Sequence, residues 1–517
     1  MPSSIIRGKY VVCKITGRDS AQVISEGAVF QQAGEIIEVG KFDQIRARHP
    51  TEEVIGSSKH VVMPGLVNDH FHVGLTPCQL GVLDDAQELR GLRRMGARRV
   101  DPYLDQMYGA VQMIQTGTTT VQVIYGGRVT AQEMLQSAVK VFKAYQDSGM
   151  RLSFAPHIAD QNFLVVGSGG GEEEFKATLP RALRERFGSM VSRAFSTVEE
   201  WMSCFDDLFR KYDGRGNSDG RIRLTLGPGN VHRCSDQLLG TIKDMARKYD
   251  TAIHIHLQES PYQKLYGIRA WGRTPLRHLH DLEFLGPEVV CGHSVWVTDE
   301  DIELMASTGT SVCHNPSSNL RIHNGIAPIS KLLQKGVRVS LGTDEATIND
   351  DKDMLQEMRL ALRLQYLPGI ENRAPTPYEV FQMATEHGAR AAGFGDRVGT
   401  LEPGKRADMV LLNLQNIEYP YLDPDINIVE SLVYRGRSQD VDTVIIDGNV
   451  VMRDGRLTTI DVDSLFSELQ ASLDRPLRRE EKEARDTVAL VEPYLRRFLE
   501  GAFSSDVPPH AIYNSRI

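Results

Sequence analysis

The pattern of apolar and polar positions differs between the middle of the chain and its two ends. Short β-type runs at 10–12, 27–30 and 36–39 are broken by glycine or polar turns, and similar runs return at 408–412 and 441–451. Such runs are typical of hairpins in a small sheet. We expect the two ends to build one sheet domain together, with two separate small sheets as the alternative.

Between the two ends, strand-like and helix-like segments alternate. Apolar residues recur at spacings of three and four in several stretches, which indicates amphipathic helices between buried strands. Eight strands separated by helices or long connections favour an α/β fold in which a parallel sheet closes as a (β/α)8 barrel; an open doubly wound sheet is the alternative. The predicted strands are 61–67, 118–124, 151–157, 221–227, 252–258, 288–293, 310–314 and 337–343, and the predicted helices include 102–116, 131–147, 235–249, 299–307 and 353–366.

Two segments exceed what a minimal barrel needs. Residues 158–220 are too long for a plain crossover, so we expect an insertion at the barrel mouth that acts as a lid. For its glycine run, 167–171, a flexible turn is the alternative. The predicted order is a sheet part at 1–62, the barrel at 63–396, a second sheet part at 397–460 and a helical tail at 461–517.

Composition narrows the class of protein. Of 517 residues, 41% are hydrophobic and 25% charged, which excludes a collagen, a coiled coil or a largely disordered chain. Lys+Arg of 59 against Asp+Glu of 68 gives a net charge of −9, so we expect a small-molecule partner and no nucleic acid or membrane. Six scattered cysteines, no leader and no apolar stretch of about 18 residues predict a reduced, cytoplasmic protein.

Histidines and an aspartate stand at the ends of several predicted strands. His70 and His72 end the first strand, and because alternate residues of a strand share a face, both can bind one metal ion. His256 ends the fifth strand, His293 the sixth and Asp344 the eighth. Since catalytic groups of a (β/α)8 barrel gather at the C-terminal strand ends, these residues predict a metal site there.

Three nearby features need separate interpretation. Glu259, three residues beyond His256, is positioned to shuttle a proton beside a metal-bound water. His254 lies one layer deeper, and we expect a hydrogen-bonded core histidine. A second pair, His278 and His280, falls in a predicted helix where side chains two residues apart diverge, and we interpret it as a surface feature.

Together these motifs resemble the amidohydrolase superfamily, in particular its aminohydrolases of nucleobases, triazines and adenosine-like compounds. The resemblance spans roughly residues 5–460. It is carried by PGLVNDHFH at 64–72, HLQE at 256–259, GH at 292–293, HNPSSNL at 314–320, GTD at 342–344 and LEPGKRAD at 401–408. It implies a (β/α)8 barrel with a small β-sandwich formed by both chain ends.

The resemblance also implies a divalent metal, usually zinc, although iron or cobalt would accept the same ligands. The implied ligands are His70, His72, His256 and Asp344. Asp344 would also accept the proton of the attacking water, Glu259 would pass a proton to the leaving nitrogen, and His293 would hydrogen-bond to the water or the substrate. The fourth strand end, 226–232, lacks the lysine that bridges two metals in related enzymes, which favours one ion per chain.

The substrate is less defined than the chemistry. The motifs predict hydrolysis of a non-peptide carbon–nitrogen bond, foremost deamination of a cyclic amidine such as a purine, pyrimidine or triazine. The alternatives are cleavage of a urea, carbamate or amide that releases an organic amine and, more remotely, a non-catalytic scaffold. By family analogy we expect a homo-oligomer. Candidates for substrate contact, with polar loop or packing residues as the alternative, are His157, Gln161, Asn162, Asn230, His232, Trp296 and Asn315.

Overall fold

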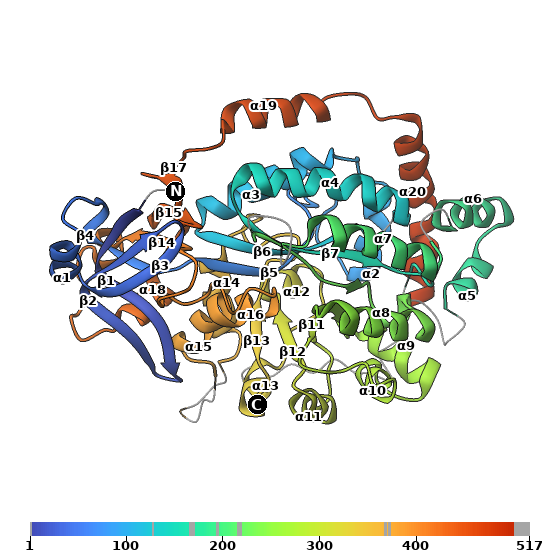
Figure 1. Cartoon of the computed structure of the whole chain (residues 1–517). Helices are drawn as coiled ribbons and strands as arrows, with labels where there is room; N and C mark the ends of the chain where they lie inside the picture. The colour runs from blue at the N-terminus through green and yellow to red at the C-terminus, as the bar shows by residue number, and fades with distance from the viewer. Residues whose placement is uncertain are drawn as a thin grey trace.

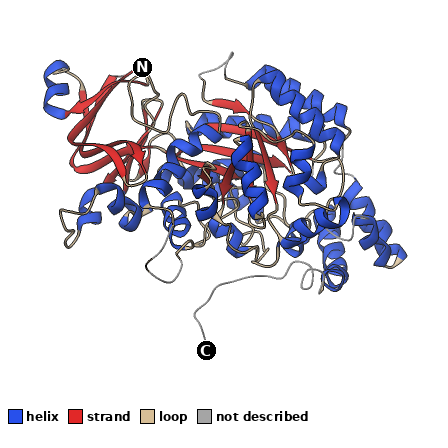
Figure 2. Ribbon diagram, turned by 90° about the horizontal axis from the view of Figure 1, so that it is seen from below, coloured by secondary structure: helices blue, strands red, loops and turns tan. Residues whose placement is uncertain are grey.

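A computed structural model describes residues 3–126, 129–164, 171–192, 196–214, 220–366, 370 and 374–500. The chain has an α/β fold in which a sheet at one side adjoins a larger body of parallel strands and helices (Figure 1). Seen from below, the parallel strands lie inside a layer of helices, and the sheet formed by the chain ends stands beside them (Figure 2). Within the described residues, no helix combines the length and apolarity needed to span a bilayer.

The two chain ends share one hydrogen-bonded sheet of eight strands in the order β17-β16-β15-β14-β4-β1-β2-β3. Strand β4 joins the two halves, because it pairs in parallel with β1 and antiparallel with β14. The strands are β1 Ser3–Gly17, β2 Ser20–Gln32, β3 Glu35–Lys41, β4 Glu53–Pro64, β14 Met409–Asn413, β15 Val441–Ile446, β16 Asn449–Arg453 and β17 Arg456–Leu457. The short helix α1, Phe42–Arg48, follows β3.

The remaining strands form two parallel sheets, β5-β6-β7-β8 with β9 beside β7, and β10-β11-β12-β13. Isolated parallel bridges join the edges of the two sheets. Leu226 pairs with Ile253 and Asn230 with His256 on one side, and Phe71 pairs with Asp344 on the other. The strands are β5 Leu66–Phe71, β6 Thr118–Gly126, β7 Arg151–Ile158, β8 Ile222–Leu224, β9 Gly227–Pro228, β10 Ile253–Leu257, β11 Val289–His293, β12 Ser311–His314 and β13 Val339–Leu341. We call their C-terminal ends the mouth and their N-terminal ends the base.

The prediction of one strand over 61–67 is wrong. Residues 61–64 end β4 of the terminal sheet, and the first parallel strand is β5. The chain changes sheets at Gly65, where a Cβ atom would lie 2.1 Å from Thr119 Oγ1. Both strands are buried on both faces here, so the apolar run continues across the break and hides it.

Helices cover the parallel strands. The five predicted helices correspond to α3 Pro102–Gln115, α4 Ala131–Ser148, α8 Asp236–Tyr249, α11 Asp299–Thr308 and α14 Met354–Arg363. Their starts follow local capping: Asp101 accepts hydrogen bonds from the first turn of α3, and Thr130 forms a capping box with Glu133. Other helices are α2 Gln87–Arg94, α9 Pro261–Trp271, α10 Pro275–Asp281, α12 Pro316–Arg321, α13 Ile329–Gln334, α15 Pro377–Gln382, α16 Gly388–Ala391, α17 Leu414–Glu418 and α18 Ile428–Arg435.

The long segment between β7 and β8 contains three helices with different positions. Helix α7, Val198–Tyr212, packs against α4 and α8 and therefore serves as the ordinary crossover. Helices α5, Gly171–Thr178, and α6, Arg181–Ser192, are the additional part and pack against α20. Positions 165–170, which hold most of the predicted glycine run, lie outside the described residues.

The C-terminal tail runs along the body toward the mouth. Helix α19, Val462–Leu473, packs on α3, and α20, Arg479–Leu499, packs on α2, α5 and α6 (Figure 1). The buried side chains that join these helices form what we call the cover cluster. Its members are Leu89, Leu92, Met95, Phe163, Leu164, Phe175, Leu179, Phe187, Val191, Val488, Val491, Leu495 and Leu499.

Buried ion pairs connect the parallel strands to the terminal sheet. Arg151, at the start of β7, has no exposed side-chain surface. Its guanidinium donates to Asp408 Oδ2 at 2.7 Å and to Asp447 Oδ1 at 2.8 Å. A charged group buried this deeply requires such partners, so the sheet is attached at a defined place.

Candidate active site

Two histidines project from the C-terminal end of β5 at the mouth. The Nδ1 atom of His70 lies 2.9 Å from His254 Nε2, which leaves the His70 Nε2 atom without a hydrogen-bond partner among the described residues. The expectation that His254 is a hydrogen-bonded core histidine is confirmed. The Nδ1 atom of His72 lies 2.6 Å from the carbonyl oxygen of Ile124, so its Nε2 atom also faces inward.

His256 and Asp344, at the ends of β10 and β13, both lie close to the Nε2 atom of His72. His72 Nε2 lies 3.1 Å from His256 Nε2 and 3.2 Å from Asp344 Oδ1. His70 Nε2 lies 3.8 Å from the same carboxylate oxygen. Residues from three strands, far apart in sequence, thus direct ring nitrogens and a carboxylate toward a common space.

Tight backbone geometry brings these strand ends together. Asp344 has a φ of 55° and His293 a φ of 66°, a left-handed conformation that costs non-glycine residues about 1–3 kcal/mol. At Gly342, a Cβ atom would lie 2.5 Å from the Cβ of His70, so only glycine permits this approach. The Asp344 amide donates to the His70 carbonyl at 2.7 Å and joins β13 to β5 at the site.

His293 and Glu259 stand beside this group. His293 Nδ1 lies 2.9 Å from Asn319 Oδ1, and its Nε2 lies 3.7 Å from Glu259 Oε1. The side-chain amide of Gln263 donates to Glu259 Oε2 at 3.3 Å. Both side chains are almost fully buried, and Glu259 lies beyond the strand that carries His256.

Burial sets the protonation of the cluster. Desolvation, followed by the neighbouring histidines, holds the pKa values of His70 and His256 well below the usual range. Burial opposes ionisation of Asp344, but the neighbouring His72 and His293, the hydrogen bond from Ser318 and the charge of Arg90 together lower the pKa of this carboxyl. Neutral imidazoles with available lone pairs beside a carboxylate form a donor set that suits a divalent metal.

The residues predicted to contact substrate divide into two groups. His157 and His232 each retain a buried ring nitrogen without a partner in the described part of the chain, and the His157 ring centroid is 5.8 Å from that of His256. Asn230 Oδ1 lies 3.0 Å from His232 Nδ1, and buried Asn315 directs its amide toward His293.

The other three side chains donate hydrogen bonds to backbone carbonyl oxygens. Gln161 and Asn162 donate to the carbonyl oxygen of His232 at 3.3 and 3.0 Å. Trp296 donates its indole N–H to the Asn324 carbonyl at 2.9 Å. These contacts favour the interpretation that the three side chains hold loops together.

Sequence reasoning missed the charged side chains of α2. Arg90 and Arg94 both contact Glu345, which directly follows Asp344. On the same helix, Glu88 accepts a hydrogen bond from Ser260 Oγ at 2.5 Å, and burial raises the pKa of Glu88 to about 7. The sequence analysis predicted no element at 87–94, and the partners of these side chains are far away in sequence. Helix α2 therefore joins the cover cluster to the loop that carries Asp344.

The interpretation of His278 and His280 as surface residues is wrong for the first of them. Both lie in α10, as predicted, but His278 is 8% exposed. Its ring stacks on Trp271 with centroids 4.0 Å apart, and its Nε2 lies 2.8 Å from Asp236 Oδ1. A helical histidine is thus buried by neighbours that the local pattern does not show.

The chain is similar to known proteins over most of its length. The sequence profile described as the amidohydrolase family matches residues 61–451. The chain is 31% identical over 485 residues to a 5'-deoxyadenosine deaminase of Methanosarcina mazei, covering 93% of this chain and 99% of that one. It is 28% identical over 464 residues to a 5-methylthioadenosine/S-adenosylhomocysteine deaminase of Caldanaerobacter subterraneus subsp. tengcongensis, covering 89% and 95%.

Solved structures show a similar fold. An adenosine deaminase from Xanthomonas campestris with bound zinc superposes with a TM-score of 0.76 at 24% identity, covering 95% of this chain and 99% of that one. An atrazine chlorohydrolase from Arthrobacter aurescens complexed with zinc gives a TM-score of 0.76 at 22% identity, covering 90% and 99%. The profile match and the full-length relatives together show that the chain belongs to the amidohydrolase family and is a hydrolase of carbon–nitrogen bonds other than peptide bonds.

Proposed function

We propose that the protein hydrolytically deaminates a purine-like substrate of the adenosine type, with one divalent metal ion held by His70, His72, His256 and Asp344. The observation that carries the proposal is the convergence of these side chains from three strand ends, with His72 Nε2 at 3.1 Å from His256 Nε2 and 3.2 Å from Asp344 Oδ1. The deaminase names of the full-length relatives support the choice of reaction.

The residues fit a metal ion. Two ligand atoms about 2.0–2.1 Å from one zinc ion lie roughly 3.0–3.4 Å apart. The separations of 3.1 and 3.2 Å at His72 fall in this range, and the unpartnered Nε2 of His70 offers a further lone pair. When bound, such a cation lowers the pKa of a coordinated water toward about 7 and supplies a nucleophile at neutral pH.

In this proposal two side chains transfer protons and a third forms a hydrogen bond to the water or the substrate. A water oxygen adds to the ring carbon that bears the amino group, and Asp344, ionised at neutral pH, accepts the water's proton. Glu259 passes a proton to the departing nitrogen so that neutral ammonia leaves. His293, held through Nδ1 by Asn319 and near Glu259 through Nε2, hydrogen-bonds to the water or to the substrate.

The architecture proposed for this site is a closed (β/α)8 barrel. The bridges from the residues just after β8 to β10, and from β5 to the residue Asp344 after β13, support closure, because an open sheet would leave two free edges. In this arrangement the boundary predicted at 62/63 moves to Pro64, where β4 ends. Residues 65–396 form the barrel, the segments up to Pro64 and at 397–460 form the β-sandwich domain, and α19 and α20 form the helical tail. The proposed single ion is supported by the absence of lysine at 226–232.

The test is a substrate screen with enzyme reconstituted with zinc. Adenosine, 5'-deoxyadenosine, 5-methylthioadenosine, an aminopyrimidine, an aminotriazine and a phenylurea are compared, and ammonia and organic amine are assayed separately. We expect ammonia release with the adenosine-type compounds and about one metal ion per chain by elemental analysis. Release of an organic amine from the phenylurea without ammonia from any purine would replace deamination by urea hydrolysis.

A further inference from the structure

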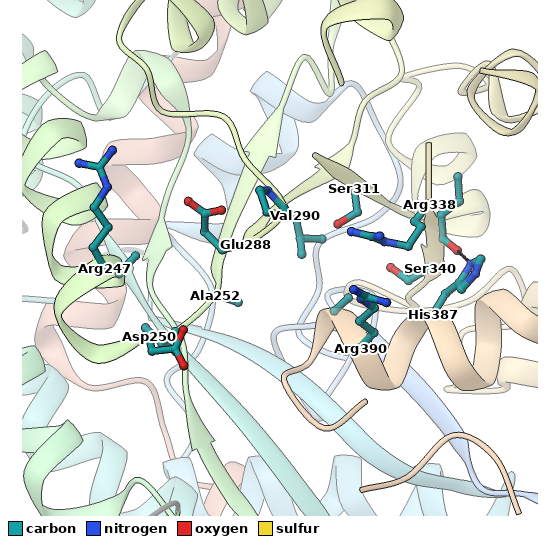
Figure 3. A pocket seen from close by; sticks show the side chains of 15 residues that line it. Arg247, Asp250, Ala252, Glu288, Val290, Ser311, Arg338, Ser340, His387 and Arg390 are labelled. Carbon is teal, nitrogen blue, oxygen red and sulfur yellow. Dashed lines mark hydrogen bonds between the residues drawn. The ribbon is translucent and has the colours of Figure 1, made fainter. Parts of the chain in front are cut away.

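A polar pocket lies at the base, at the opposite end of the strands from the histidine cluster. It has a volume of about 410 Å³ and is lined by residues at the start of β11, β12 and β13, by the end of α8 and the loop after it, and by His387, Arg390 and Ala391 (Figure 3). This volume lies within the range of about 300–1,000 Å³ that is typical of small-molecule sites. None of the residues assigned to catalysis or metal binding lines it.

Two arginines dominate one wall of this pocket. Figure 3 shows the guanidinium groups of Arg338 and Arg390 on the same side, near the hydroxyls of Ser311 and Ser340. Arg338 donates to the Gly309 carbonyl at 3.3 Å. Neither guanidinium forms an ion pair with a carboxylate of the described residues, whereas most arginines near the mouth do so.

Two cations in one concavity repel each other. The pKa of Arg338 is lowered by burial and, in addition, by the charge of Arg390. Nearby His387 adds no third positive charge, because burial lowers the pKa of its ring, and its Nδ1 lies 3.0 Å from the Val339 carbonyl oxygen. An anion between the two guanidiniums would relieve this repulsion and accept bidentate hydrogen bonds.

The opposite wall limits the ligand to one negative group. Glu288 and Asp250 lie on the other side of the pocket in Figure 3. Glu288 forms an ion pair with Lys243. Arg247, which also lines this wall, lies 3.2 Å from Asp244, so its positive charge already has a partner. A second anionic group placed there would meet carboxylates, whereas hydroxyl or amino donors would find acceptors.

We propose that the base pocket binds a small molecule that carries a single oxyanion, a phosphate ester or a carboxylate, on a hydrogen-bond-donating body. The oxyanion lies between Arg338 and Arg390, and the body extends toward Glu288 and Asp250. This site is separate from the proposed deaminase site, so its occupancy does not require catalysis.

The experiment is calorimetric titration of the full-length, zinc-reconstituted protein with three matched ligands. Ribose 5-phosphate tests a phosphate ester, ribonate tests a carboxylate, and ribose supplies the same body without charge. We expect one-to-one binding of at least one anion, weakened by rising ionic strength, and no binding of ribose. The two anionic arms distinguish phosphate from carboxylate recognition.

Matched variants locate the binding. Arg338→Gln and Arg390→Gln should each weaken the anion by about 10-fold or more, the effect of losing a charge-assisted hydrogen bond. Arg247→Gln, on the same pocket but paired with Asp244, should leave affinity unchanged. Metal content and turnover measured without the anion should stay at the wild-type level in all three.

Three outcomes would overturn the proposal. They are failure of both anions to bind, equal binding of ribose, and anion affinity that is unchanged in the Arg338/Arg390 double variant. Arg390 is exposed, so Arg390→Gln remains an informative test even where Arg338→Gln lowers the melting temperature.

Discussion

The two ends of strands β10 to β13 carry polar groups of different kinds. At the mouth, His256, His293 and Asp344 are at most 8% exposed, and each contacts another titratable group of the cluster. At the base, Arg390 is exposed and Arg338 is only partly buried, and neither has an ionic partner among the described residues. The same strands therefore present a desolvated cluster at one end and a solvated cationic pocket at the other.

The difference in burial suits the mouth to catalysis and the base to reversible ligand binding. Burial at the mouth keeps imidazoles neutral and holds their lone pairs in place, which is what metal binding and proton transfer require. The guanidinium groups at the base stay in contact with water, which suits reversible attraction of an anion. Substitutions of the same type at the two ends should consequently have unequal effects.

The largest contrast should come from replacing a histidine at each end. His256→Ala should remove the metal and reduce kcat/KM by more than ~10⁴-fold, because enzymatic accelerations of ~10⁶-fold or more depend on the activated nucleophile. His387→Ala, at the base, should leave metal content and turnover unchanged. Elemental analysis and steady-state kinetics measure both. A His256→Ala protein that keeps its metal would remove this residue from the ligand set.

The next contrast concerns proton transfer. Glu259→Gln should lower kcat by about 10²–10⁴-fold, since the amide cannot carry the proton, while metal content stays at the wild-type level and KM changes little. Glu288→Gln makes the same change at the base and should leave kcat unaltered. If Glu259→Gln retained more than about a tenth of wild-type kcat, His293 would become the first candidate for the transfer.

A smaller effect should follow from opening the cover cluster above the mouth. Leu495 is fully buried, so Leu495→Ala should lower the free energy of unfolding by about 2–5 kcal/mol. Because the cluster also holds α2, which contacts the loop of Asp344, we expect KM to rise while metal content is retained. Leu490→Ala on the same helix, where the side chain is 54% exposed, is the control. Unchanged melting temperature and KM in Leu495→Ala would show that the cover is dispensable.

The last contrast concerns the pH dependence of stability, which depends on a buried carboxyl behind the mouth. Burial raises the pKa of Glu357 from 4.5 to about 8, although two hydrogen bonds from Ser317 oppose this. The folded protein is therefore protonated here while the unfolded chain is ionised, so stability falls as pH rises from about 4.5 to about 8.

Glu357→Gln removes this titration. Relative to the variant, the wild type should lose about 1.4 kcal/mol of unfolding free energy per pH unit across that interval and nothing more above it. Denaturant unfolding at a series of pH values measures the difference. Parallel stability curves would mean that Glu357 is ionised in the folded protein.

Local pattern predicted many elements closely. Helices α3, α4 and α8 begin and end within a residue or two of their predicted bounds, because capping residues and helical spacing act over a few positions. The same pattern failed at Gly65, since two doubly buried strands read as one apolar run. It also treated α7 as part of an insertion, because the distinction between crossover and addition depends on packing against α4 and α8.

The sequence by itself determined which residues could carry chemistry, since the order of strands and the position of each histidine at a strand end are properties of the chain. Only the tertiary structure decided which of them meet. The contacts of Arg90 and Arg94 with Glu345, the burial of His278 and the pairing of His70 with His254 join residues far apart in sequence. Such contacts arise from the closing of strand ends and the packing of helices over them, which no local spacing encodes.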